Sequence, residues 1–165
     1  PHYVIPRTLL FATGFSTIAL ATAKASIDIA VNFANTGQTG RSSTTLRERD
    51  TIQRSIGEIR ATYSSSRAFL RQSMAKVWES ANKNGSASVE ERINLRLAAT
   101  HGIRSAVGVV DACYNMCGSS AISASNPIQR RFQDIHVITQ HIQGHPINYE
   151  TAGQFFLGLE PQGNF

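Results

Sequence analysis

The 165-residue sequence lacks several features that would assign a protein class directly. It has two cysteines, Cys113 and Cys117, which form no disulfide framework and, without a second pair, are a weak metal signal. No uninterrupted apolar run reaches the roughly 18 to 20 residues of a membrane span, since Lys24 and Asp28 interrupt the nearest candidate, 9–31. These absences predict a soluble protein of a reducing compartment, the cytoplasm, without a membrane segment.

Nucleotide-binding and hydrolytic motifs are also missing, because the chain has no GxGxxG, P-loop, HExxH or Ser-His-Asp order. It starts at Pro1 without a signal pattern, so we expect a piece or a processed form of a longer protein. The formal net charge of +5 permits binding to phosphates. The arginines are spread through helical segments without interleaved aromatics, which disfavours nucleic acid as the partner.

What the sequence does contain is helical periodicity. Apolar residues recur at steps of three and four in four segments, approximately 6–33, 45–82, 88–116 and 126–142. In the first segment this stripe comprises Phe11, Phe15, Ile18, Ala21, Ala25, Ile29 and Phe33, and the many Ala and Thr residues indicate close packing. Because the connecting loops are short and no alternating strand pattern is present, we predict an all-α, antiparallel up-and-down four-helix bundle. The whole chain, 1–165, is one domain.

Several residues mark helix boundaries. Thr45–Glu48 and Ser88–Glu91 match the capping box, and Asn126 followed by a proline is a typical helix start. Gly57, inside the second segment, predicts a close approach between helices. Gly144, followed by His-Pro, is expected to end the fourth helix.

Most of the polar chemistry lies in the last third of the chain. The loop 118–120 is made of small residues and can present N–H groups to a phosphate next to a helix start, but the spacing alone favours a plain turn between antiparallel helices. His136 and His141 are five residues apart and do not form an i, i+4 metal pair. On such helices a single histidine is usually a hydrogen-bonded core or interface residue. The residues alone therefore indicate a helical bundle with an unusually polar end.

Longer stretches carry a family resemblance. These are LRERDTIQRSIGEIRATYSSSRAFL (46–70), CGSSAI (117–122), NPIQRRFQDIHVITQH (126–141) and NYETAGQFFLGLEP (148–161). Together they resemble the C-terminal helical domain of the acyl-CoA dehydrogenase superfamily, and more narrowly its type-2 branch, which includes two-component flavin-dependent monooxygenases. The resemblance implies a longer subunit with an N-terminal helical and a middle β-domain, assembled as a homotetramer. It also implies a flavin, FMN or FAD, between the middle domain and this bundle.

The resemblance assigns cofactor contacts to individual residues. Gly118, Ser119 and Ser120 match the loop that contacts the flavin phosphate in a partner subunit, which favours the phosphate site over the plain turn. Gln53 matches a glutamine near the cofactor across the subunit interface. Where dehydrogenases have an Arg-x-x-Phe-Gly turn, this chain has GQTGR, and Arg41 is the candidate substitute for the positive charge.

The resemblance also assigns roles to residues of the fourth segment. Arg131 and Asp134 match a structural pair at the start of the last helix. Over the flavin ring many acyl-CoA dehydrogenases place a glutamate base, but residues 140–144, QHIQG, include no carboxylate. The monooxygenase branch has a histidine in this region. We therefore assign His141, with His136 as the second candidate, to removing a phenol proton or donating a hydrogen bond at the flavin.

The implied function is that of a flavin-binding and oligomerisation domain of a two-component monooxygenase acting on an aromatic or heterocyclic small molecule. A separate reductase would supply the reduced flavin, and this fragment alone would be inactive. One alternative is an FAD-dependent acyl-CoA dehydrogenase, and another is a non-catalytic helical oligomerisation module. No metal is expected.

Overall fold

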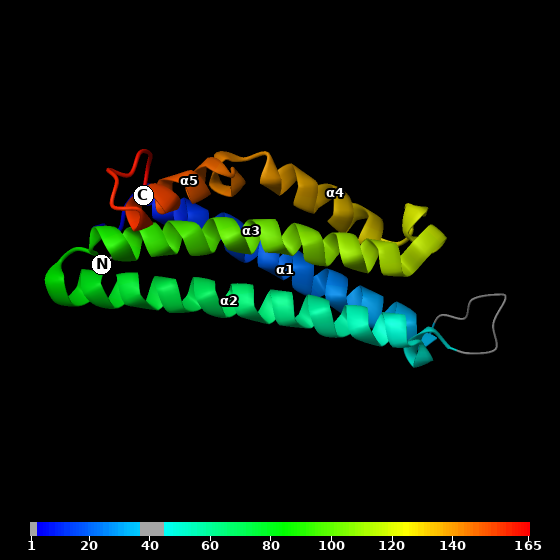
Figure 1. Cartoon of the computed structure of the whole chain (residues 1–165). Helices are drawn as coiled ribbons and strands as arrows, with labels where there is room; N and C mark the ends of the chain where they lie inside the picture. The colour runs from blue at the N-terminus through cyan, green and yellow to red at the C-terminus, as the bar shows by residue number, and fades with distance from the viewer. Residues whose placement is uncertain (1–2, 37–44) are drawn as a thin grey trace.

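The structure, a computed structural model, describes residues 3–36 and 45–165. This part of the chain contains five α-helices and three short 3₁₀ helices and no β-strand, in agreement with the all-α prediction (Figure 1). In chain order the elements are α1 (Arg7–Thr36), η1 (Leu46–Glu48), α2 (Asp50–Asn84), α3 (Val89–Cys117), η2 (Gly118–Ile122), α4 (Pro127–Thr139), η3 (Ile142–Gly144) and α5 (Ile147–Phe156).

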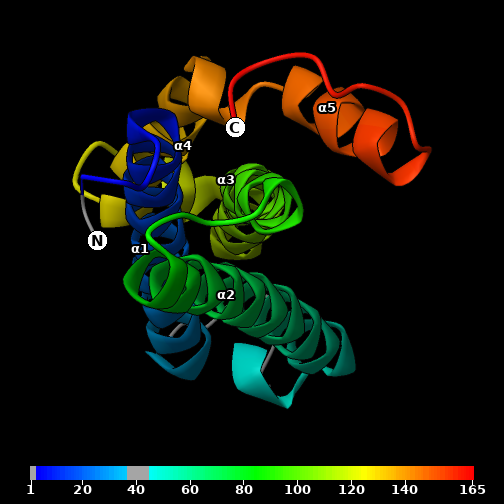
Figure 2. The same cartoon turned by 90° about the vertical axis from the view of Figure 1, so that its left-hand side faces the viewer.

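Helix α3 is the centre of the bundle. Helices α1, α2 and α3 run antiparallel to their chain neighbours, and α4 and α5 together return along α3 as the fourth leg (Figure 1). The view along the bundle places α3 between α1, α2 and the α4–α5 leg (Figure 2), and α3 packs against all four. Contact on several sides explains why α3 is apolar around most of its circumference.

The predicted fourth helix ends earlier than expected, and a separate helix, α5, follows it. It was expected to continue through Ile142, but α4 ends at Thr139, whose hydroxyl donates to the carbonyl of His136 at 2.7 Å. The N–H of Gln140 then bonds the carbonyl of Val137 at 3.1 Å, a tighter turn than an α-helix makes. Helix α5 was not predicted, because its buried face is largely polar and so gives no apolar period: the buried residues are Asn148, Thr151 and Ala152.

The predicted caps are largely confirmed. Ser88 Oγ accepts from the N–H of Glu91 at 3.2 Å, and the Glu91 carboxylate accepts from the N–H of Ser88 at 2.8 Å. Asn126 Oδ1 accepts from the N–H of Ile128 at 3.1 Å, with proline at the first helical position. The motif at Thr45 caps the short η1 instead, and α2 begins only at Asp50.

Helix α1 buries a face of small residues. Its buried positions include Ala12, Ser16, Ala19, Ala23, Ala30 and Ala34, together with Leu9 and Ile27. The stripe of larger residues predicted from the sequence is turned partly outward, with Phe11 55% and Ile18 59% exposed. The small face lets α1 approach α3 closely at Gly102, where an added Cβ would overlap Ser16 Oγ. The prediction for Gly57 was wrong, since that residue is exposed and faces open space.

By length and composition, α1 would also be able to cross a membrane. In this structure 44% of its most apolar stretch is buried inside the bundle, where α1 packs along α3. Core helices of soluble proteins meet the same criterion, so the property does not assign α1 to a membrane.

Candidate functional site

His141 lies at the junction of α4 and η3, with its ring against α1. The imidazole stacks on Phe15, with the ring centroids 4.1 Å apart and the planes 14° from parallel. Its Nδ1 accepts a hydrogen bond from the backbone N–H of Gln143 at 3.3 Å, so that His141 is the N-cap of η3. The residue itself is exposed.

These two contacts fix the chemical character of the ring. Accepting a bond from an N–H requires a lone pair on Nδ1, so the neutral imidazole of His141 carries its proton on Nε2. Nε2–H is then the polar group left to interact with a ligand. The arrangement presents a hydrogen-bond donor, and using the ring as a base at Nδ1 would first require breaking the bond to Gln143.

The surface around the stacked pair is apolar. Phe11 and Ile18 lie one turn before and after Phe15 on α1, and Ile142, next to His141, is 56% exposed. A soluble helix normally places such side chains inward. The outward apolar face beside an imidazole is suited to a flat, largely apolar ligand.

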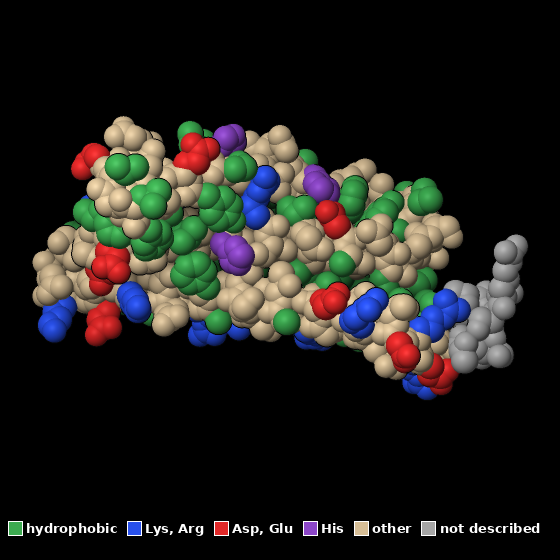
Figure 3. Space-filling model, viewed as in Figure 1, with side chains coloured by type: hydrophobic (Ala, Val, Ile, Leu, Met, Phe, Trp, Pro, Cys, Tyr) green, Lys and Arg blue, Asp and Glu red, His purple; other side chains and the backbone are tan. Residues whose placement is uncertain are grey.

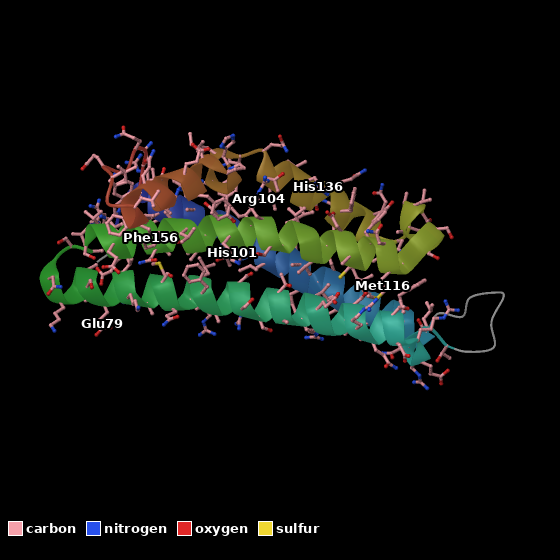
Figure 4. All side chains as sticks on the ribbon, viewed as in Figure 1. Glu79, His101, Arg104, Met116, His136 and Phe156 are labelled. Atoms are coloured by element: carbon pink, nitrogen blue, oxygen red, sulfur yellow. The ribbon has the colours of Figure 1, made fainter. Side chains whose placement is uncertain are left out.

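His136, the second candidate, belongs to a different side of the fourth leg. Its Nε2 lies 3.0 Å from Oδ1 of Asp111 on α3, and its ring meets Phe132 edge-on with centroids 4.7 Å apart. Figure 4 shows His136 projecting over α3, apart from His101. His136 and His141 therefore have separate partners, and they do not form one site.

The small-residue loop forms η2. Gly118 has a φ of +55° with a ψ of −140°, a conformation that only glycine adopts readily. Ser119 and Ser120 are exposed, and the carbonyl of Ser120 accepts from Asn126 Nδ2 at 3.0 Å. A hollow of about 480 Å³ lies beside the loop. It is lined by Ile29, Asn32, Phe33, Thr36, Ser120, Ser123, Ser125, Asn126 and Pro127.

The donors offered by this hollow differ from those expected. The N-terminal N–H groups of α4 are already occupied, because Ile128 N–H bonds Asn126 Oδ1 and Gln129 N–H bonds the Asn126 carbonyl. Proline has no N–H. The serine hydroxyls and the side-chain amide of Asn32 are donors that the lining offers to a phosphate, and the hydroxyls of Ser123 and Ser125 already lie 2.8 Å apart.

Gln53 lies near the start of α2. Its Nε2 donates to the carbonyl of Arg47 at 3.0 Å, which leaves its Oε1 as an acceptor. With Arg47 and Asn35 it lines a second hollow, of about 310 Å³, whose other lining residues are Val31, Ala34, Ile52 and Ile56. Arg41 lies outside the residues that the structure describes.

The expected pair of Arg131 and Asp134 is not formed. Asp134 instead lies 3.7 Å from Nε of Arg130, which is one helical turn away on the same face. Both side chains are largely exposed, so this ion pair contributes little stability. Arg131 is half-buried and makes no ion pair with any described carboxylate.

The two cysteines, one helical turn apart on α3, are free and buried. Burial, together with the neighbouring Cys117, raises the pKa of Cys113 to about 12, and burial also raises the pKa of Cys117. Neither thiol is therefore an available nucleophile. Within residues 3–36 and 45–165 no cluster of three His, Cys, Asp or Glu side chains has the arrangement of a metal site.

The candidate residues thus form two groups. The start of α2, which carries Gln53, and the loop 118–120 lie at the same end of the bundle (Figure 1). His141 lies nearer the middle, since the adjoining Gly144 packs on Ile103 of α3. From Ile103 to Cys117, where the loop begins, α3 rises about 20 Å. Flat apolar contacts at one group and hydroxyls at the other fit the ring and the phosphate of a flavin.

The structure also reveals contacts that the sequence did not predict. Phe15 was recognised as apolar, but nothing in the sequence indicated that it would support His141. The buried polar cluster of Arg96, Gln143 and Asn148 beneath this turn was also missed. A lone arginine within the apolar stretch 93–103 was the available signal.

Comparisons with known proteins identify the family of the chain. A family model described as the acyl-CoA dehydrogenase C-terminal domain matches residues 13–146. The chain is 31% identical over 166 residues to the indole-3-acetate monooxygenase of Pseudomonas putida, covering 98% of this chain and 41% of that protein. It is 27% identical over 128 residues to the oxygenase component of the FADH2-dependent resorcinol hydroxylase of a Rhizobium species, covering 73% of this chain and 31% of that protein.

A solved structure has the same fold. XiaF from a Streptomyces species, in complex with FADH2 and glycerol, superposes with a TM-score of 0.88 at 18% identity, covering 96% of this chain and 41% of XiaF. The chain thus spans about two fifths of the length of the curated relatives that it matches best. With the family model matching most of its length, the chain belongs to the acyl-CoA dehydrogenase C-terminal-domain family, and its sequence relatives there are monooxygenases and hydroxylases.

Proposed function

We propose that this chain is the C-terminal helical domain of a flavin-dependent monooxygenase that hydroxylates an aromatic or heterocyclic small molecule. The observation that carries the proposal is His141, an imidazole stacked on Phe15 where many acyl-CoA dehydrogenases have a glutamate base. The names of the sequence relatives, a monooxygenase of indole-3-acetate and a hydroxylase of resorcinol, support an aromatic substrate. The fragment alone is inactive in this proposal.

His141 acts as a hydrogen-bond donor in this site. When bound, a reduced flavin supplies the electrons that activate O₂. The Nε2–H of His141 would donate a hydrogen bond to a hydroxyl of the substrate, while Gln143 keeps Nδ1 occupied. The outward faces of Phe11 and Ile18 bind the apolar part of the substrate and exclude water.

The assembly that fits this chain is a homotetramer supplied by a separate flavin reductase in the cytoplasm. The oxygenase-component name of the resorcinol hydroxylase supports a two-component system. Hydrophobic side chains gather over α5 and the C-terminal tail (Figure 3), where Phe156, Leu157 and Leu159 are 58%, 79% and 59% exposed. Apolar groups exposed together in this way favour a buried interface in the assembled protein.

The second candidate is an FAD-dependent acyl-CoA dehydrogenase, which the family description favours. The missing carboxylate in residues 140–144 opposes it, because the one basic side chain there, His141, has its Nδ1 lone pair engaged by the N–H of Gln143. Adding an acyl-CoA thioester anaerobically to the intact flavoprotein would bleach its flavin only if the dehydrogenase assignment is correct. An intact protein that forms tetramers without binding flavin would instead be a non-catalytic module.

The test of His141 uses His141→Asn in the intact enzyme. Asparagine keeps an acceptor for the N–H of Gln143 but removes the ring and its Nε2–H. We expect kcat/KM for hydroxylation to fall about 10²- to 10⁴-fold while flavin affinity stays near the wild-type value. The measurement is hydroxylated product formed per reduced flavin oxidised, with hydrogen peroxide release accounting for the remainder.

His145 provides the matched control. Its Nδ1 accepts from the N–H of Ile147 at 3.2 Å, the same type of bond as in His141, but no ring of the described residues stacks on it. His145→Asn should therefore leave product yield unchanged. Wild-type yield in His141→Asn would refute the assignment, and loss of yield in His136→Asn alone would transfer it to His136.

A further inference from the structure

A buried arginine lies beneath the turn that carries His141. Arg96, on α3, is only 4% exposed. Its Nη1 donates to Gln143 Oε1 and its Nη2 donates to Asn148 Oδ1 at 2.9 Å. No described carboxylate forms an ion pair with it. A buried guanidinium held only by neutral amides is costly to desolvate, so its position depends on keeping both amides in place.

The turn is attached to one face of α3. Thr100 donates from its hydroxyl to the carbonyl of Gln143 at 3.2 Å. Gly144 packs so closely that an added Cβ would lie 2.9 Å from Cγ2 of Ile103. Positions 96, 100 and 103 follow the helical period, so these three contacts form a continuous row on α3.

The first turn of α5 closes the cluster from the other side. Asn148 Nδ2 donates to the carbonyl of Ile142 at 3.1 Å and to that of Gln143 at 3.4 Å. Its Oδ1 is the group that accepts from Arg96. Both amide groups that bind the guanidinium are therefore also part of the backbone geometry of the turn.

Gln143 connects this cluster to the candidate catalytic histidine. Its side chain accepts from Arg96, its carbonyl accepts from Thr100, and its N–H donates to Nδ1 of His141. We propose that Arg96 is a positioning residue for the monooxygenase reaction, which sets the orientation of His141 by holding Gln143. This inference rests on the proposed function of His141, which Arg96 does not itself touch.

Fold stability alone would not require an arginine here. An apolar side chain of similar volume commonly stabilises a core as well as a buried charge, or better. The guanidinium adds a defined geometry, because its planar N–H donors hold two acceptor oxygens from different segments in fixed positions. Removing it should therefore disturb the geometry of His141 more than the stability of the bundle.

The test compares Arg96→Met and Gln143→Leu in the intact enzyme. We expect kcat for hydroxylated product to fall about 10- to 100-fold with little change in KM, and the product yield per reduced flavin oxidised to fall as well. If Arg96 acts through Gln143, the double variant should be no worse than either single variant. Losses that multiply in the double variant would overturn the proposal.

A crystal structure of Arg96→Met gives the readout independent of activity. The expected result is that the His141 ring leaves Phe15, with which it is stacked at 4.1 Å in the wild-type chain. A purely structural role would lower the free energy of unfolding but leave the stacking and the product yield unchanged, and that result would overturn the inference. If Arg96→Met does not fold, Arg96→Lys is judged by the same two readouts, since lysine reaches one amide at most.

Arg92 is the matched control. It lies one turn earlier on α3, and its Nη1 donates to the carbonyl of Phe165 at 3.4 Å, away from the turn. Arg92→Met should retain the stacking and the product yield, and loss of both would overturn the specific role of Arg96. If His141→Asn leaves the product yield unchanged, the proposed function of His141 is wrong. In that case the positioning role of Arg96 is judged only by whether the His141 ring moves in the structure of Arg96→Met.

Discussion

Glu91 connects the first turn of α3 to the neighbouring helix α2 by hydrogen bonds. Its carboxylate accepts from the N–H of Ser88 at 2.8 Å and from the hydroxyl of Ser80, on α2, at 2.6 Å. The hydrogen bond from Ser80, followed by the backbone bond from Ser88, holds the pKa of Glu91 below its ordinary value of 4.5. A carboxyl with a lower pKa in the folded state stabilises the fold above its unfolded pKa, and that stabilisation is lost as the pH falls through the folded value.

Glu91→Gln should therefore lower the urea midpoint of the chain at neutral pH. Glutamine still fits the capping box but lacks the charge, so the loss is small. The difference from wild type should shrink as the pH falls below 4.5 and disappear once Glu91 is protonated in the folded chain. Glu90→Gln, the exposed neighbour in the same first turn, is the control. A difference that persists unchanged into acid would contradict the charge-based explanation.

At the scale of helices, the sequence correctly predicted the features that depend on residues close together in the chain. The caps at Ser88 and Asn126 were correct because each depends on a side chain within three residues of the N–H it binds. The early end of α4 at Thr139 was missed because the turn that follows is held by tertiary contacts of Gln143 with α3. The spacing of apolar residues within one segment does not indicate a contact with a residue 47 positions away in the chain.

Replacing glycine by alanine should change the stability of the chain in opposite directions at the two glycines of α3. Gly108 is exposed in mid-helix and an added Cβ meets open space. Gly108→Ala should stabilise the chain by about 0.5–1 kcal/mol through helix propensity. Gly102→Ala should destabilise it by about 1–3 kcal/mol, because its Cβ overlaps Ser16 where α1 and α3 meet.

Urea denaturation followed by circular dichroism measures both effects. If Gly102→Ala is as stable as Gly108→Ala, then α1 does not approach α3 as closely as the structure shows. The sequence had placed such an approach at Gly57, because it reveals the glycines of a helix but not which of them faces another helix.

At the scale of the molecule, the candidate site was only partly predictable. His141 was identified by a family resemblance, and the structure adds the stacking on Phe15 and the bond from Gln143 that give it a defined tautomer. The predicted pair of Arg131 and Asp134 was wrong. The resemblance gives the residue type at each position, but side-chain geometry decides that Asp134 pairs with Arg130 instead of Arg131. The separation between His141 and the loop 118–120 depends on the fold and was beyond the sequence.

That separation allows a test of how the subunits share a flavin. In the tetramer proposed here, each flavin ring meets His141 of its own subunit, while its phosphate meets the loop 118–120 of a neighbour. Ser120→Asp places a negative charge beside the phosphate and should weaken flavin binding, whereas His141→Asn should retain binding but lose hydroxylation. Each variant alone is then inactive for a different reason.

Mixed assemblies of the two inactive variants should regain activity. In a dimer with one subunit of each kind, one flavin meets an intact histidine from the first subunit and an intact loop from the second. Random mixing at equal amounts would restore roughly a quarter of the wild-type sites, because half of the dimers are mixed and half of their sites are intact. Co-expression of the two variant subunits in equal amounts, purification of all assemblies through one tag that both carry, and an assay of hydroxylated product measure this recovery. If both groups of residues serve one flavin within a single subunit, mixing restores nothing, and the arrangement across subunits is wrong even though the roles of His141 and Ser120 stand.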